Sequence, residues 1–171
     1  MSILIYAESA EGKIKKVALE LASYAKKVAA SMGTTVTAVT INNADNSALA
    51  ACGVDKVLTV TNDKLNNFSA KAYADVIVQA AKKEGTQIVL VSSSTNSLYL
   101  APLVAVALEA GYVSNVVALP ESTSPFQVKR TVFSNKAFNV TEIATPIKVL
   151  GIAKNSFGLV ESASTLAEES F

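Results

Sequence analysis

Short apolar runs alternate in this chain with longer segments of helical periodicity, and this alternation restricts the folds that it can adopt. The strand-like runs cover residues 2–7, 34–41, 55–60, 86–92 and 113–119. The helical patterns cover residues 13–32, 45–52, 69–84 and 103–110. Strands that are apolar throughout and alternate with helices form parallel sheets through right-handed crossovers, with helices on both faces.

The pattern changes after residue 125. Residues 126–133 and 137–144 are β-type segments, and the short polar stretch between them predicts an antiparallel hairpin. A final strand is expected over residues 147–153. The predicted fold class is therefore α/β: a three-layer α/β/α Rossmann-like sandwich with a mostly parallel sheet and a late antiparallel hairpin.

A chain of 171 residues is most simply one domain with a sizeable core. We expect residues 1–154 to form that domain and residues 155–171 to be a C-terminal tail or linker, because the last stretch is polar and lacks clear periodicity. Gly111 is expected to end the helix that contains residues 103–110, and Pro102 is expected early in the same helix, where a missing amide hydrogen costs little.

The composition excludes several classes of function. The chain contains no His and one Cys, which rules out His-dependent nucleophiles, His-ligated zinc and multi-cysteine metal sites. A formal net charge of +1, with charges dispersed along the chain, predicts no nucleic-acid partner and no polybasic membrane anchor. The first residues lack a basic leader and a long apolar run, so we expect a cytoplasmic protein without membrane insertion.

The loop after the first strand, "AESAEGK", is a poor phosphate-binding loop. Ligands of open α/β sheets bind beyond the carboxyl ends of the strands, and a phosphate there needs free amides without a nearby anion. Glu8 and Glu11 both lie in this loop, so neither a dinucleotide fingerprint nor a Walker loop is present. We expect the negative charge of Glu11 to stabilise the N-terminus of the following helix, and we expect Glu8 to be solvated or paired with a partner.

The polar run Ser92–Ser97 allows two interpretations. Its hydroxyls and Asn96 could hold a ligand, or they could cap the next helix, and capping is the favoured interpretation. No base accompanies the serines, which argues against a nucleophile. The helix that follows is apolar on nearly all sides, so it is expected to be buried on more than one side, either by a partner subunit or by the late hairpin.

Arg130 is the only arginine of the chain. Two interpretations stay open for it: a pairing or stacking residue at an interface, where arginine is favoured over lysine, and a solvated strand residue.

Several segments in order resemble the N-terminal domain of the electron transfer flavoprotein α subunit. They are "ILIYAESAEGKIKKVALELASYAKKVA", "GVDKV", "TQIVLVSSSTNSLYLAPLVAVALEAGYVSNVVAL" and "VKRTVFSNKAFNV". The resemblance extends from about Ile3 to about Ala153. It implies a heterodimer of α and β subunits that passes electrons from dehydrogenases to the respiratory chain through a quinone-linked acceptor.

The resemblance also implies where the cofactors lie. In that family FAD is held mainly by a second, C-terminal domain of α together with β, and AMP, where present, lies in β. The present chain is then the part that packs on β, with no cofactor in this chain alone. By the same resemblance it is not an enzyme but an electron carrier subunit domain without catalytic residues of its own.

The sequence departs from the family before and after "LAP". The family usually has a Gly and a charged pair where this chain has Ser97, Leu98 and Tyr99, and a basic residue where this chain has Leu103. These changes make the surface more apolar, which suits a protein interface, whereas Arg130 and Lys136 match the family pattern. The predicted partner interface comprises Asn96, Leu98, Tyr99, Leu103, Arg130 and Lys136.

The alternative function is a small adenine-nucleotide-binding domain of universal-stress-protein type. Such domains place a glycine-rich phosphate loop after a late strand. Residues 91–119 supply no such loop.

Overall fold

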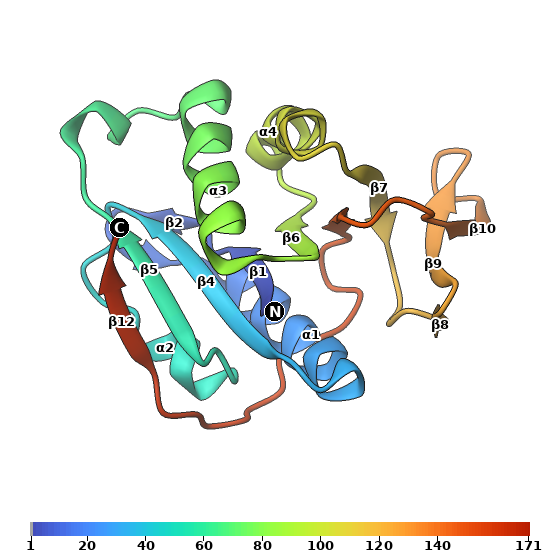
Figure 1. Ribbon diagram of the computed structural model, residues 1–171, viewed down its shortest axis with the longest axis horizontal. Coiled ribbons are helices and arrows are strands. Elements are labelled where there is room, and N and C mark those ends of the chain that lie inside the picture. The colour runs from blue at the N-terminus through green and yellow to red at the C-terminus, as the bar shows by residue number, and fades with distance from the viewer. Residues whose placement is uncertain (1) are drawn as a thin grey trace.

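A mostly parallel sheet runs through the middle of the molecule, and helices cover both of its faces (Figure 1). The computed structural model describes residues 2–171. The parallel strands lie in the order β7-β11-β6-β1-β4-β5. Their bounds are Ser2–Tyr6 for β1, Thr35–Ile41 for β4, Lys56–Val60 for β5, Ile88–Ser92 for β6, Gly111–Val116 for β7 and Lys148–Ile152 for β11. The predicted α/β/α sandwich is confirmed.

The late hairpin extends one end of the sheet. Strand β9 (Phe126–Val132) pairs antiparallel with β7 and with β10 (Ala137–Glu142), and the two-residue β8 (Ser122–Thr123) pairs with β9. The hairpin lies beyond β7, at the opposite end of the sheet from β5 (Figure 1). The predicted antiparallel hairpin is therefore confirmed.

Each central strand sends alternate side chains to two separate apolar clusters. Ile3 and Ile5 of β1 pack with Leu21 of α1 (Lys16–Met32), in a cluster that also takes in α2 (Ser47–Ala51). Leu4 packs on the other face, in a cluster with α3 (Ala70–Glu84) and α4 (Thr95–Ala107). Burial on both faces explains why β1 and β6 are almost entirely apolar.

The chain leaves β1 through a small hairpin that the sequence did not predict. Strands β2 (Ser9–Ala10) and β3 (Lys13–Ile14) pair antiparallel, and the turn between them places Glu11 at φ 52° and Gly12 at φ 72°. Helix α1 therefore begins three residues later than the pattern indicated. The expectation that Glu11 would stabilise the start of this helix was wrong, because its first turn contains no acidic residue.

Helix α4 begins after the predicted cap in the polar run and ends earlier than expected. Ser94 caps it, so Pro102 lies in the interior of the helix rather than near its start. The helix ends at Ala107, with Leu108 as its C-cap, and Gly111 is the first residue of β7. The expected end at Gly111 was therefore wrong. A Cβ at this glycine would lie 2.6 Å from Cγ2 of Ile143, so close packing explains the glycine better than helix termination does.

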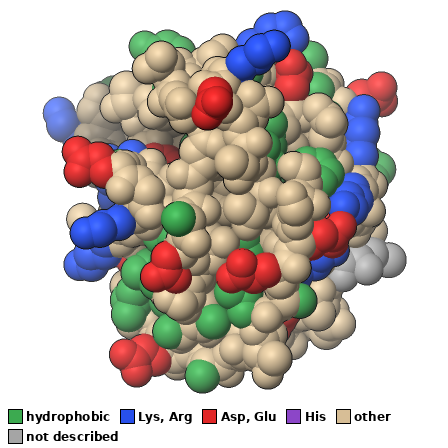
Figure 2. Space-filling model, turned by 90° about the vertical axis from the view of Figure 1, so that its left-hand side faces the viewer, with side chains coloured by type: hydrophobic (Ala, Val, Ile, Leu, Met, Phe, Trp, Pro, Cys, Tyr) green, Lys and Arg blue, Asp and Glu red, His purple; other side chains and the backbone are tan. Residues whose placement is uncertain are grey.

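Residues 155–171, expected as a tail or linker, return to the sheet. Their last part forms β12 (Ala167–Ser170), which pairs parallel with β5, so this part of the expected tail is a strand of the sheet. Glu169 forms ion pairs with Lys56 of β5 and with Lys83 of α3. Figure 2 views this side of the molecule and shows acidic and basic side chains interspersed over it. The domain boundary at residue 154 stays a prediction.

Candidate functional site

The carboxyl ends of β1 and β6 mark the place where a ligand would be expected in a sheet of this topology. From β1 the chain continues to β4 on one side, whereas β6 leads to β7 and β11 on the other side. Such a topological switch point leaves a crevice between neighbouring loops, and ligands of doubly wound folds bind there.

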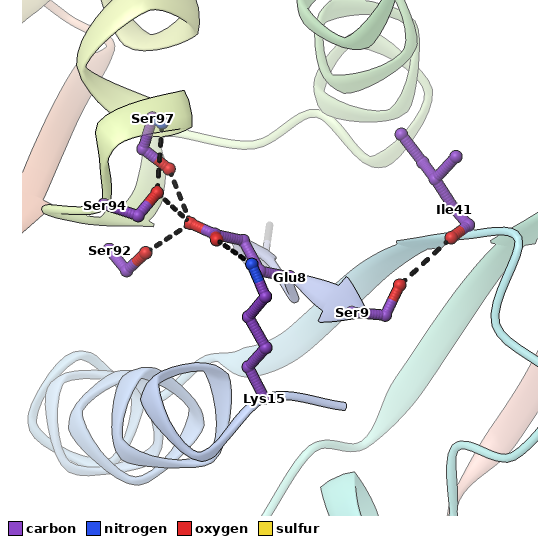
Figure 3. Close-up of polar contacts among 7 residues, drawn as sticks. All are labelled: Glu8, Ser9, Lys15, Ile41, Ser92, Ser94 and Ser97. Atoms are coloured by element: carbon purple, nitrogen blue, oxygen red, sulfur yellow. Dashed lines mark hydrogen bonds and ion pairs between the residues drawn. The ribbon is translucent and has the colours of Figure 1, made fainter. Parts of the chain in front are cut away.

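The carboxylate of Glu8 fills this position. Its side-chain oxygen Oε1 accepts hydrogen bonds from the hydroxyls of Ser92, Ser94 and Ser97, at 2.5, 2.5 and 2.9 Å (Figure 3). The second oxygen, Oε2, lies 3.3 Å from Nζ of Lys15. Glu8 is only 2% exposed, so the expectation of a solvated Glu8 was wrong, whereas the alternative, that it pairs with a partner, is met by Lys15 of its own chain.

The surroundings of Glu8 favour its ionised form. Burial alone raises the pKa of this carboxyl, but the hydrogen bonds from the three serines and the positive charge of Lys15 lower the pKa, and the net shift is downward. A buried carboxylate needs such compensation, because an unpaired charge in the interior is costly. The serine loop therefore serves as the solvation shell of an internal anion.

The polar run is also a helix cap, as predicted. Oγ of Ser94 accepts the backbone amide hydrogen of Ser97 at 3.1 Å, which satisfies one of the free amides at the start of α4. The same hydroxyl donates to Glu8. Ser92 and Ser97 both direct their hydroxyls at the carboxylate, so the cap and the anion contact form one polar cluster.

Sequence reasoning missed this cluster although a signal existed. Glu8 follows one buried strand and Ser92 ends another, and parallel strands that are neighbours in a sheet bring their carboxyl ends together. The pairing of β1 with β6 could not be read from the spacing of the residues. The two loops were therefore considered separately, one as a failed phosphate loop and the other as a cap.

Four apolar side chains on the outer side of α4 are exposed, and we call them the α4 surface: Leu98, Tyr99, Leu103 and Val106. Their exposed fractions are 52%, 66%, 44% and 80%. The opposite side of the helix is buried against the sheet through residues such as Leu100 and Val104. We expected either a partner subunit or the late hairpin to cover this outer side of the helix. The hairpin does not cover it, since these four side chains remain exposed.

The predicted interface residues fall into two groups. Asn96 lies in the first turn of α4, half-buried, and Leu98, Tyr99 and Leu103 lie on the α4 surface. Arg130 lies on β9, half-buried, and Lys136 lies exposed in the turn of the hairpin. The sequence prediction of an interface at these residues stays a prediction.

Arg130 pairs weakly within the chain. A guanidinium nitrogen, Nη2, donates to Oγ of Ser114 at 3.4 Å, and its buried Nε has no hydrogen-bond partner among the described residues. No carboxylate is paired with this guanidinium among the ion pairs of residues 2–171. Its side chain is thus neither fully solvated nor fully satisfied.

Two further features are absent from the part of the chain that the structure describes. Residues 2–171 contain no group of three or more His, Cys, Asp or Glu side chains placed to hold a metal ion. Across the same residues, no helix has the length and apolar character needed to cross a membrane.

The chain matches the family of the electron transfer flavoprotein domain over residues 3–169. It is 33% identical over 120 residues to the electron transfer flavoprotein subunit alpha of Thermoanaerobacterium thermosaccharolyticum, which covers 68% of this chain and 36% of the relative. Identity to the same subunit of Clostridium acetobutylicum is 30% over the same coverage. A lactate dehydrogenase (NAD(+),ferredoxin) subunit, LctC, of Acetobacterium woodii is 30% identical over 150 residues, 84% of this chain and 36% of the relative.

The fold and its filled switch point define a three-layer α/β domain whose ligand position is taken by its own carboxylate. The family match identifies this domain: the chain belongs to the electron transfer flavoprotein family and corresponds to the N-terminal domain of the α subunit. It spans a little over a third of the length of these relatives. The universal-stress-protein alternative gains no support from these matches.

Proposed function

We propose that this domain is a scaffold for the β subunit in a heterodimer that carries electrons from dehydrogenases to the respiratory chain. The observation that carries the proposal is the α4 surface. Its helix packs against the sheet on one side, and it presents four exposed apolar side chains on the other. Contiguous apolar surface of this kind marks a protein interface on a small domain.

The chemistry of the domain supports a scaffold rather than a catalyst. Its switch point holds an internal carboxylate, and the described residues contain no cluster suited to a metal. We propose that the chain alone holds no FAD and is not an enzyme. In the complete heterodimer, FAD would be held elsewhere and AMP would lie in the β subunit.

The name of one relative supports a proposal about the electron donor. LctC is named as a subunit of a lactate dehydrogenase that uses NAD(+) and ferredoxin. We propose that the heterodimer of the present chain likewise works with dehydrogenases, and that it does so in the cytoplasm, without membrane insertion.

The experiment is a titration of the chain with the β subunit of the same organism, comparing Leu103→Glu with the unchanged chain. A carboxylate in the middle of an apolar contact must be desolvated, so the dissociation constant should rise about tenfold or more. Leu159→Glu is the matched control, because Leu159 is 45% exposed and lies far along the chain from α4. Its dissociation constant should change by about twofold or less.

Two results would contradict the proposal. If both variants lose affinity equally, the α4 surface is not the contact with the β subunit. If the unchanged chain forms no complex at micromolar concentration, the domain is not a scaffold for the β subunit. A flavin spectrum in stoichiometric amount from the purified chain alone would contradict the claim that it holds no FAD.

A further inference from the structure

We propose that Ser92, Ser94, Ser97 and Lys15 form a binding site for a small oxyanion, and that Glu8 is the internal ligand that keeps it closed. This inference goes beyond the scaffold function and does not depend on it. It concerns what the switch point of this fold can bind when the carboxylate is removed.

The hydrogen bonds that the three serine hydroxyls donate all point toward the carboxylate of Glu8. An ionised carboxylate only accepts hydrogen bonds, so each of the three hydroxyls must donate to it. All three converge on one atom, Oε1 of Glu8, while the ammonium group of Lys15 faces Oε2. Donors that converge in this way, together with a positive charge, match the requirements of a carboxylate or phosphate oxygen.

The serines of the site and its internal ligand, Glu8, belong to different segments of the chain. The serines lie at the end of β6 and the start of α4, whereas Glu8 reaches in from the loop after β1 (Figure 3). The backbone of Glu8 has its own anchor, since its carbonyl oxygen accepts the amide hydrogen of Lys15 at 2.9 Å. Loss of the side chain therefore removes the anion without removing the backbone contact that holds the loop.

The negative charge of Glu8 excludes a second anion from the site. A phosphate that approached the switch point of the unchanged chain would meet a negative charge that is already solvated by the available donors. Two anions cannot share these donors, because their repulsion is strong in a buried site. Folds of this topology bind phosphate groups at this position, and Glu8 thus prevents such binding in the unchanged chain.

The test is chemical rescue of Glu8→Ala. This substitution removes a carboxymethyl group, CH2–COO⁻, and acetate is that group with one added hydrogen. We expect the Tm of Glu8→Ala to rise with acetate and to saturate, by about 2–4 °C when acetate is about five times its dissociation constant. Sodium chloride at equal ionic strength should give no saturating rise, and neither should acetate added to the unchanged chain.

Two control variants separate this site from general salt effects. Glu11→Ala removes an exposed carboxylate of the same loop and should show no acetate dependence. Glu8→Ala combined with Ser97→Ala should bind acetate more weakly, because one of the donors is lost. Inorganic phosphate, tested in parallel, determines whether the opened site also accepts a tetrahedral oxyanion.

The outcomes are decisive even if Glu8→Ala folds poorly. In that case refolding is measured with acetate and with chloride, and recovery only with acetate supports the proposal. Equal recovery in both salts, or a folded Glu8→Ala without a saturable response to acetate or phosphate, would overturn it. Saturable binding of phosphate by the unchanged chain at this position would also overturn it, because Glu8 would then not close the site.

Discussion

Replacing Glu8 by Gln tests how much the buried carboxylate contributes to stability. The substitution keeps the size of the side chain and removes its charge. The three serine hydroxyls then donate to a neutral amide oxygen, which cannot serve all of them as well as the carboxylate oxygen does. The amide nitrogen also brings two hydrogens toward a position that was occupied by an acceptor.

The expected loss follows from the contacts. A hydrogen bond to a charged group contributes about 1 kcal/mol more than one between neutral groups, so three of them amount to about 3 kcal/mol. The ion pair with Lys15 adds little, because the lysine side chain is 40% exposed and solvent screens the pair. We therefore predict that the free energy of unfolding falls by about 3 kcal/mol.

Urea unfolding followed by far-UV circular dichroism measures this loss, since the chain contains no Trp for fluorescence. With a denaturant dependence of about 2 kcal/mol/M, the midpoint should fall by about 1.5 M. Glu11→Gln, an exposed glutamate of the same loop, should leave the midpoint unchanged. A shift for Glu8→Gln as small as that of the control would refute the argument that the serine loop solvates an essential charge.

The pH dependence provides a second measurement of the same contact. The pKa of Glu8 is lowered from its ordinary value of 4.5 in the folded chain, so its contribution is complete above that value. The contribution is lost as the pH falls through the lower pKa of the folded state. The difference in stability between the unchanged chain and Glu8→Gln should therefore narrow in acid, and a constant difference would refute the linkage.

Two further substitutions test other contacts of the fold. In Gly111→Ala, the new Cβ would lie 2.6 Å from Cγ2 of Ile143, so overpacking should lower the free energy of unfolding by about 1–3 kcal/mol, and an unchanged Tm would contradict this. Hydrogen bonds from two lysine ammonium groups lower the pKa of Glu169 to about 2, so its ion pairs are complete above pH 4.5 and are lost as the pH falls through about 2. Glu169→Gln should speed hydrogen exchange in β12 at neutral pH, whereas Glu168→Gln should not. Equal exchange rates in the two variants would contradict the claim that the ion pairs of Glu169 hold β12 on the sheet.

The sheet and its helices were predictable because burial on both faces leaves a strong pattern. Runs such as residues 88–91 are apolar without interruption, and only a strand covered on two sides needs that composition. The hairpin was predictable for a related reason, since the polar turn at residues 134–136 separates two β-type segments. Local composition carries both signals.

The features that were missed depend on contacts between distant segments. The strand at Ala167–Ser170 forms because β5 offers a free edge and because Glu169 meets two lysines there. Nothing in the polar sequence of the tail records that edge. The Glu8 cluster is similar, since it exists only once β1 and β6 are neighbours.

The order of the strands has a consequence for how the chain acquires its structure during synthesis. Strand β11 lies between β6 and β7, yet its residues, Lys148–Ile152, are synthesised after both of its neighbours and after the hairpin. Until then β6 and β7 have no common partner, and the gap between them exposes strand edges that invite wrong pairing. We expect a nascent chain that ends before residue 148 to remain open at the middle of its sheet. The last strand to reach the sheet interior, rather than the first, would then determine when the domain becomes resistant to proteases.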